Sequence, residues 1–366
     1  CVVTTLLLPQ GGHEPLLSFV RWHLHLGIER LYLYFDDDTS DEPVGWTELE
    51  ALLDELDARQ FVERFRRTPE LADEWRRCAS FARFGAFVNE EVQARQALNA
   101  EHASLAAREA GLKWLVHIDI DELLYASSKE ALVDHFEAMD AAGVGHVTYA
   151  NHEGVPETDA VDYFSAVTLF KRNHLVVPLS DEARQAMRWW RDRTRRGQYL
   201  LCYDNGKSAV RLVPGIAPTS VHAWSVPGLR RRTALADPRG DLTELAHIEE
   251  PCVLHYVACG AFWLRTKYEI LGNFDDAWFG GALPIAPSFH LDARDVVAKH
   301  DPSLFQAFYD AHVALRLDSD RLNALLAAGV LATRKEVEHD FIARFPQSEA
   351  CVLASGHLVF ATKAAY

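Results

Sequence analysis

The chain has 366 residues, enough for one large α/β domain or two packed lobes. Its 37 Lys and Arg against 53 Asp and Glu give a formal net charge of −16. This argues against a general nucleic-acid binder or a binder of anionic membranes, because both need a basic surface. No apolar run is long enough for a membrane-spanning helix, and no signal peptide is recognisable. The chain begins at Cys1, so the compartment stays open.

Six scattered cysteines with no CxxC pair predict buried free thiols rather than a structural zinc site, with a disulfide as the alternative. The first half of the chain alternates short β-rich apolar runs with segments of helical periodicity. We predict strands at Val2–Leu8, Leu31–Phe35, Phe61–Phe65, Trp114–Ile118 and Val144–Tyr149. Helices are predicted at His13–Leu26, Trp46–Ala58, Glu90–Ala110 and Lys129–Ala142, with turns at Gly11-Gly12 and Gly27.

The second half is less regular. Ser180–Arg196 is rich in Arg and Trp and is predicted as a helix or a mobile loop, and Leu229–Asp241 as an exposed loop. Strands are predicted at Gln198–Cys202, Ser208–Val213, Thr219–His222 and Cys252–Val257, with a hairpin at Val352–Phe360. Helices are predicted at 262–273, 290–299, 302–316, 318–328 and 333–345.

Strands alternating with helices predict an α/β fold with a doubly wound, mostly parallel sheet and a helical C-terminal extension. In such sheets ligands bind beyond the carboxyl ends of the strands. Two acidic clusters fall there, Asp36–Asp41 after Phe35 and Asp119–Glu122 after Ile118. A carboxylate of the first cluster could bind a base or ribose; the alternative is a solvated turn.

Asp119 and Asp121 stand two residues apart at a strand end, and would share one side if the strand continued. Two such carboxylates suit Mn²⁺ or Mg²⁺, and a cation there could bridge a diphosphate. The alternative is a helix N-cap with an acidic first turn. His222 and His255 each end an apolar run and are candidates for a third metal ligand, against the alternative of a satisfied buried histidine.

Basic and acidic side chains further along complete the candidate site. The candidates for binding phosphate are Lys207, Arg211 and Lys267, with surface charge as the alternative. The candidates for a catalytic base are Glu153, Asp275 and Asp276, with a loop carboxylate as the alternative. Trp278 and Phe279 could stack on a sugar face.

Several of these segments resemble a known family. Glu14-Pro15-Leu16 through His23, Tyr32-Leu33-Tyr34-Phe35-Asp36-Asp37, and Trp114-Leu115-Val116-His117-Ile118-Asp119-Ile120-Asp121-Glu122-Leu123 resemble glycosyltransferase family 92, the galactan-synthase-like family, and its family 2-like relatives. Gly206-Lys207-Ser208 with Arg211, Val221-His222, and Leu254-His255-Tyr256 followed by Lys267-Tyr268 are similar to later blocks. The likeness covers about residues 1–275. Leu123 replaces the usual Phe, and segment 181–197 has no counterpart.

The resemblance implies a GT-A fold, a nucleotide-sugar donor with a UDP-sugar favoured, a glycan or other hydroxyl acceptor, and inversion of configuration. It further implies Mn²⁺ held by Asp119, Asp121 and a histidine, and contacts from Glu14, Asp36 and Asp37 to the nucleoside. Thr5, in the first strand, is counted with the donor-binding residues. We expect a catalytic domain at 1–275, with a donor half to about 125 and an acceptor half from 126, and a helical extension at 276–366.

Two other functions stay open at this stage. One is a metal-dependent phosphotransferase or phosphatase with Asp119 as the nucleophile, for which no downstream lysine and acidic signature is recognisable. The other is a non-catalytic nucleotide- or glycan-binding module. The Asp119 and Asp121 pair argues against this function, because binding alone does not require a cation for the leaving group.

Overall fold

The computed structural model describes residues 1–7, 13–37, 45–56, 58–156, 159–177, 180–194, 196–233, 243–245, 249–285, 288–314, 317–334, 350–352 and 358–360. The predicted Gly11-Gly12 turn and the Asp38–Asp41 part of the first acidic cluster lie outside these residues. Most of the predicted helix at 333–345 also lies outside them.

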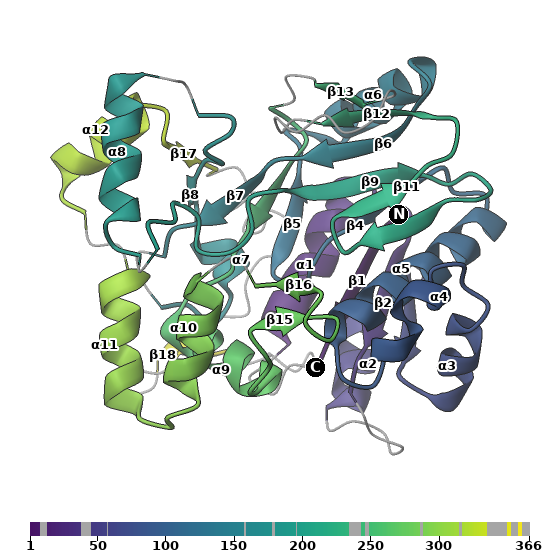
Figure 1. Cartoon of the computed structure of the whole chain (residues 1–366), viewed down its shortest axis with the longest axis horizontal. Coiled ribbons are helices and arrows are strands. Elements are labelled where there is room, and N and C mark those ends of the chain that lie inside the picture. Colours follow the sequence, from purple (N-terminus) through teal and green to yellow (C-terminus); the bar gives the residue numbers. More distant parts are fainter. Residues whose placement is uncertain are drawn as a thin grey trace.

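An eight-stranded sheet forms the centre of the molecule, in the order β13-β12-β6-β9-β4-β1-β2-β3 (Figure 1). Among these strands only β9 runs against the others, so the predicted mostly parallel sheet is confirmed. Its strands are β1 (Val2–Leu6), β2 (Leu31–Phe35), β3 (Val62–Arg66), β4 (Trp114–His117), β6 (Val144–Tyr149), β9 (Lys207–Arg211), β12 (Arg230–Thr233) and β13 (Thr243–Leu245).

The strand order reverses between β1 and β4. The chain moves outward from β1 to β2 and β3, and then crosses back to place β4 on the other side of β1. Such a switch leaves a crevice at the carboxyl ends of the two central strands. Leu6 and His117 end these strands, so residues that follow them lie at the edge of the sheet where such folds bind ligands.

Alternating side chains on the central strands enter two separate hydrophobic cores. Val2 and Leu6 pack in one core with α1 (Glu14–His25), α2 (Trp46–Glu55) and α6 (Lys129–Ala141). Val3 packs in the other, with α3 (Pro69–Trp75), α4 (Phe81–Phe84) and α5 (Val92–Glu109). Successive side chains of these strands point to opposite faces of the sheet, and both faces are buried, as a doubly wound sheet requires. Several buried alanines on α5 let it lie close to the sheet: Ala94, Ala97, Ala100, Ala103 and Ala107.

A second, five-stranded sheet has the order β17-β8-β7-β14-β5. Its strands are β5 (Glu122–Tyr125), β7 (Asn151–Gly154), β8 (Leu169–Lys171), β14 (Cys252–His255) and β17 (Leu331–Thr333). Helices gather beside it on the left of Figure 1, and these are α8 (Asp181–Arg191), α9 (Ala261–Leu271), α10 (Ser288–Val297), α11 (Pro302–His312) and α12 (Ser319–Ala327). Because β17 pairs with β8, the last part of the chain contributes a strand to this sheet.

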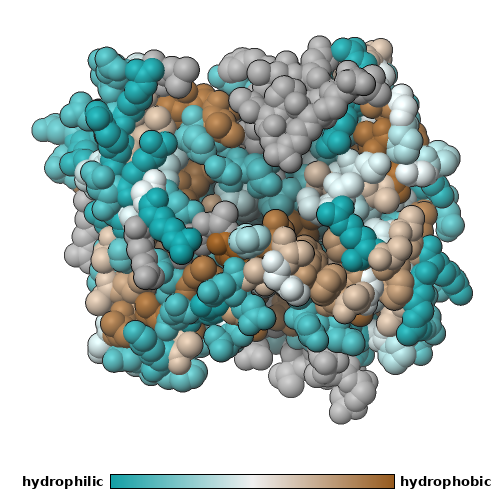
Figure 2. Space-filling view, viewed as in Figure 1, coloured by the Kyte–Doolittle hydropathy of each residue, from teal (hydrophilic) through white to brown (hydrophobic). Residues whose placement is uncertain are grey.

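The remaining short elements are α7 (Tyr163–Ala166), the 3₁₀ turns at Arg59–Phe61 and Gly85–Phe87, and three small antiparallel pairs. The pairs are β10 (Ala217–Ser220) with β11 (Ala223–Ser225), β15 (Ala277–Trp278) with β16 (Leu283–Pro284), and β18 (Ala350–Val352) with β19 (Leu358–Phe360). The last pair is the predicted C-terminal hairpin. From the same side, the surface is hollowed near its middle (Figure 2).

Three predictions about elements need correction. Residues 198–202 form bends rather than a strand, because Leu201 and Cys202 give their amides to the Glu153 carboxylate instead of a neighbouring strand. Arg230–Thr233, predicted as loop, is β12, because its backbone pairs with β6. Thr333, the first residue of the predicted helix 333–345, is instead the last residue of strand β17 (Leu331–Thr333). The Arg- and Trp-rich segment is helix α8.

Two further findings bear on the predicted class of protein. The five described cysteines, Cys1, Cys78, Cys202, Cys252 and Cys259, are free thiols, as predicted. In the described part of the chain, no helix combines the length and hydrophobicity needed to cross a bilayer.

Candidate active site

The acidic turn Asp119–Glu122 joins the two sheets at the switch point. Strand β4 ends at His117, and the Asp119 amide donates to Glu122 Oε2 over 2.7 Å while the Glu122 amide donates to the Asp119 carbonyl over 3.1 Å. The chain then enters β5 at Glu122. The turn is therefore neither a continued strand nor a helix N-terminus, and this reciprocal bonding joins Asp119 to Glu122 across it.

Two lysines from distant parts of the chain bind the two aspartates. Lys207, fully buried, places Nζ 2.8 Å from Asp119 Oδ2 and 3.6 Å from Glu122 Oε2. Its position follows from the reversed direction of β9, which puts residue 207 beside the carboxyl end of β4. Lys267, on α9, places Nζ 2.6 Å from Asp121 Oδ2. Two of the three candidates for phosphate binding, Lys207 and Lys267, thus lie at the acidic turn.

Both candidate histidines also reach this turn. His255 pairs with Glu122 across β14 and β5, and its Nε2 lies 3.7 Å from Asp121 Oδ2, beyond hydrogen-bonding distance. It is 2% exposed, and neither ring nitrogen has a hydrogen-bond partner. His222 Nδ1 lies 2.8 Å from the Gly206 carbonyl, so it carries the proton and leaves Nε2 with a free lone pair.

The helix α5 ties three strand ends together. Arg95 makes a bidentate ion pair with Asp36 after β2, with distances of 2.6 and 2.7 Å. The next residue, Gln96, donates to Asp119 Oδ1 over 3.0 Å, and Asn99 donates to Thr5 Oγ1 in β1 over 3.1 Å. One helical turn therefore links the first acidic cluster to the second. Asp36 is buried and fully engaged by Arg95, and Asp37 follows it at the same edge.

Burial and the lysines shift the ionisation of the turn in opposite directions. Burial alone raises the pKa of Asp119 and of Asp121, but the Lys207 and Lys267 ammonium groups outweigh it and hold both pKa values below their ordinary range. Burial raises the pKa of Glu122 to about 7. Burial, with Lys207 nearby, lowers the pKa of His222 to about 3. The two aspartates are therefore ionised and His222 is neutral at pH 7, as metal ligands must be.

The residues present fit a divalent cation in their chemistry. Oxygen from Asp119 and Asp121 with imidazole nitrogen from His222 and His255 is a donor set that Mn²⁺ accepts, and the bare nitrogens of His255 are suited to such a partner. The two carboxylates face lysines instead of one another. Accordingly, no group of three or more His, Cys, Asp or Glu side chains lies at metal-binding spacing among the described residues.

Two predicted site residues, Arg211 and Glu153, lie elsewhere. Arg211 pairs with Trp114 at the far end of β9 and binds Asp140 over 3.1 Å, so it does not share a site with Lys207. Glu153 is fully buried, bonded to Lys171 over 2.8 Å and to two backbone amides. These bonds give Glu153 a structural role, and neither of its carboxylate oxygens is left free to act as a catalytic base. Glu14 begins α1, which follows β1.

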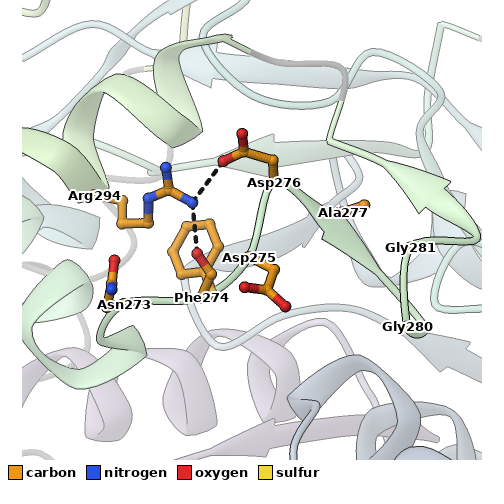
Figure 3. Close-up of a pocket in the computed structure, with 8 residues that line it drawn as sticks. All are labelled: Asn273, Phe274, Asp275, Asp276, Ala277, Gly280, Gly281 and Arg294. Carbon is orange, nitrogen blue, oxygen red and sulfur yellow. Dashed lines mark hydrogen bonds and ion pairs between the residues drawn. The ribbon is translucent and has the colours of Figure 1, made fainter.

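A separate pocket of about 550 Å³ contains the other two candidate bases, Asp275 and Asp276. Asp276 binds Arg294 over 3.0 Å, whereas the Asp275 carboxylate points away from Arg294 (Figure 3). The remaining lining residues are Asn273, Phe274, Ala277, Gly280 and Gly281. Trp278 stacks on Phe274, with ring centroids 5.1 Å apart, and Phe274 lies 4.8 Å from His290, which is bonded to Tyr268 beside Lys267. The pocket is thus close to α9 and its lysine.

Two residues of the acidic site were missed from the sequence. Tyr203 donates its hydroxyl to Glu122 Oε1, and its ring lies between His222 and His255, with centroids 4.6 and 5.0 Å away. No local pattern marks Tyr203, since it lies in an irregular segment. Gln96 could have been found only by assuming that α5 crosses the strand ends.

The chain is similar in sequence to two Arabidopsis thaliana proteins that are named glycosyltransferase-like. One is 30% identical over 234 residues, which are 61% of this chain and 48% of that protein. The other is 27% identical over 267 residues, 70% of this chain and 46% of that protein. The chain therefore spans about half the length of these curated relatives. No protein-family model matches it.

Two solved structures show a weak likeness. One is core-mannan synthase A from Aspergillus fumigatus in an Mn/GDP form, 12% identical with a TM-score of 0.25, covering 58% of this chain and 59% of that one. The other is a mannosyltransferase from Pyrobaculum calidifontis in complex with GDP-Man and Mn²⁺, 12% identical with a TM-score of 0.29, covering 89% and 72%. Neither likeness fixes the ligand of this chain.

Proposed function

We propose that this chain is a metal-dependent glycosyltransferase with a GT-A-type catalytic domain, which transfers a sugar from a nucleotide-sugar to a hydroxyl acceptor. The observation that carries the proposal is the acidic turn at the switch point, where Asp119 and Asp121 lie with two histidines and two lysines. The names of the two plant relatives support the reaction class.

Asp119 and Asp121 would hold Mn²⁺ or Mg²⁺ with His222 or His255 as a further ligand. When bound, the cation neutralises the charge that develops on the leaving nucleoside diphosphate. Lys207 and Lys267 add fixed positive charge for the same diphosphate. Gln96 and Glu122 orient the Asp119 carboxylate and amide.

The nucleoside would bind at the carboxyl ends of β1 and β2, where α5 holds Thr5 and Asp36. Asp36 then acts together with Arg95, and Asp37 and Glu14 are the other carboxylates that we propose contact the nucleoside. We favour a UDP-sugar as the donor and inversion of configuration, both from the family resemblance.

The pocket beside α9 would take the acceptor. We propose Asp275 as the base that accepts the hydroxyl proton, since Asp276 is paired with Arg294. Trp278, stacked on Phe274, is suited to cover one face of a sugar ring. In this arrangement Lys267 lies between the donor's diphosphate and the acceptor pocket.

The test is a panel of UDP- and GDP-sugars incubated with the protein and Mn²⁺, with release of nucleoside diphosphate followed in the presence and absence of EDTA. Release that requires the metal, and that rises when a matching acceptor is added, is the expected result. Inorganic phosphate released from simple phosphoesters would instead identify a phosphatase. Nucleotide binding without turnover across the whole panel would identify a binding module and overturn the proposal.

A further inference from the structure

Each aspartate of the acidic turn already has a positive partner. We propose that Lys207 and Lys267 are resident counter-cations of the donor-free site, which hold Asp119 and Asp121 until a divalent cation takes the carboxylates. The two ammonium groups then pass to the diphosphate of the donor. This inference rests on the proposed function, and it adds that metal and nucleotide must bind cooperatively.

The contact of Lys207 is built into the fold. Its side chain is fully buried, and its Nζ reaches both Asp119 and Glu122 at 2.8 and 3.6 Å. A buried ammonium needs such partners, because an unpaired charge in the interior is costly. The lysine therefore stabilises the turn in the absence of metal, and competes with metal for the same carboxylate.

Lys267 makes the matching contact from the other side. Its Nζ lies 2.6 Å from Asp121 Oδ2, and its side chain is one-third exposed on α9. A lysine is a point charge on a flexible four-carbon stem, so it can exchange one oxygen partner for another nearby. A bidentate guanidinium, such as Arg95 on Asp36, would not release its carboxylate so readily.

His255 provides a second observation that points to a cation ligand at this turn. The ring is buried, both nitrogens lack hydrogen-bond partners, and Nε2 stands 3.7 Å from Asp121 Oδ2. A buried imidazole without a partner is unfavourable unless a ligand supplies the missing interaction. A divalent cation between His255 and Asp121 would supply it, but only after the Lys267 ammonium has moved from Asp121.

Charge balance explains why the exchange requires the nucleotide. Asp119 and Asp121 face the Lys207 and Lys267 ammonium groups one to one, so the charges of these two carboxylates are already balanced in the donor-free site. Adding a divalent cation alone would leave the site with an excess of positive charge. A nucleoside diphosphate brings the compensating negative charge, and gives both lysines a new partner. Metal alone therefore binds weakly, and metal with diphosphate binds strongly.

The experiment is isothermal titration of the nucleotide-free protein with MnCl₂, repeated with saturating UDP and with saturating GDP. The variants are Lys267→Met and Lys207→Met. Arg265→Met is the matched control, because Arg265 lies on the same helix as Lys267 but binds Glu269. Circular dichroism and the shift in melting temperature on adding MnCl₂ show whether each variant folds and binds metal.

The wild type is expected to bind Mn²⁺ far more tightly in the presence of one of the two nucleotides than in its absence. Either lysine variant should bind Mn²⁺ alone roughly ten- to a hundredfold more tightly than the wild type, because a competing unit charge a few ångströms away is gone. The same variants should bind the nucleotide more weakly, so the cooperativity falls. By reciprocity, the nucleotide's own dependence on Mn²⁺ falls by the same factor. Arg265→Met should behave as the wild type.

If Lys207→Met does not fold, Lys267→Met decides the question alone, because its side chain is partly exposed. The inference is overturned if nucleotide-free Lys267→Met binds Mn²⁺ no more tightly than the wild type, while the wild type binds a nucleotide with Mn²⁺. In that result the proposed function stands. A wild type that binds neither UDP nor GDP with Mn²⁺ overturns both proposals.

Discussion

The ion pair between Arg95 and Asp36 is expected to contribute strongly to stability, and Arg95→Met tests this. Both side chains are nearly buried, at 9% and 6% exposure, and two parallel hydrogen bonds join them. Arg95 also donates to the Val88 carbonyl over 2.8 Å. Removing the guanidinium leaves the Asp36 carboxylate buried without its partner. Breaking a buried pair in this way costs about 3–5 kcal/mol.

For a domain of this size, 1 kcal/mol corresponds to roughly 2 °C of melting temperature, so Arg95→Met should melt about 6–10 °C below the wild type. Arg30→Met is the control, because the Arg30–Glu63 pair, at 2.6 Å, is partly exposed and should contribute about 1 kcal/mol or less. The double variant Arg95→Met with Asp36→Asn removes the stranded charge and should regain part of the loss.

The assay is urea unfolding followed by tryptophan fluorescence, with thermal unfolding by circular dichroism as a second measure. The reasoning is refuted if Arg95→Met loses no more stability than Arg30→Met. It is also refuted if the double variant is no more stable than Arg95→Met alone, because the cost would then not come from the unpaired carboxylate.

Three further predictions follow from the site and the core. Asp121→Asn should fold normally but lower metal-dependent nucleotide release by about a hundredfold or more. The control Asp140→Asn, whose side chain binds Arg211 at the far end of β9, should retain this release. Equal rates in the two variants would contradict the metal assignment. Arg211→Met should bind the donor within about twofold of the wild-type affinity in titrations, because Arg211 lies roughly 13 Å along β9 from Lys207. A tenfold loss of affinity would instead show that Arg211 contributes to donor binding. Burial lowers the pKa of His146 to about 3, so the folded state binds fewer protons than the unfolded state below pH 6.5, and stability is lost as the pH falls from there. His146→Phe should reduce this loss of unfolding free energy by up to about 1.4 kcal/mol per pH unit. The measurement is urea unfolding of both proteins at pH 7 and pH 5. If the unfolding free energy of the variant depends on pH as steeply as that of the wild type, the prediction is wrong.

Local sequence determined most of the donor half. Alternation and helical periodicity predicted β1, α1, β2, α2, β3, α5 and β4 within a few residues of their observed bounds, because each signal lies within one short segment. The glycine at 27, with φ of 82°, ends α1 as predicted, since that backbone conformation favours a residue without Cβ. The strand pattern also placed Asp119 and Asp121 just beyond the carboxyl end of a central strand, which is β4.

Only the tertiary structure decided what each charged side chain contacts. Nothing near Lys207 or Arg211 distinguishes them, and the reversed direction of β9 alone sends one to Asp119 and the other to the opposite edge. Likewise Glu153 and His255 share a register on β7 and β14, yet one is saturated by Lys171 and two amides while the other has bare nitrogens. Backbone periodicity is a local property that a short window of sequence records. Partners of buried charges come from separate segments of the chain, 59 residues apart for Arg95 and Asp36 and 146 for Lys267 and Asp121, and only the packed chain brings them together.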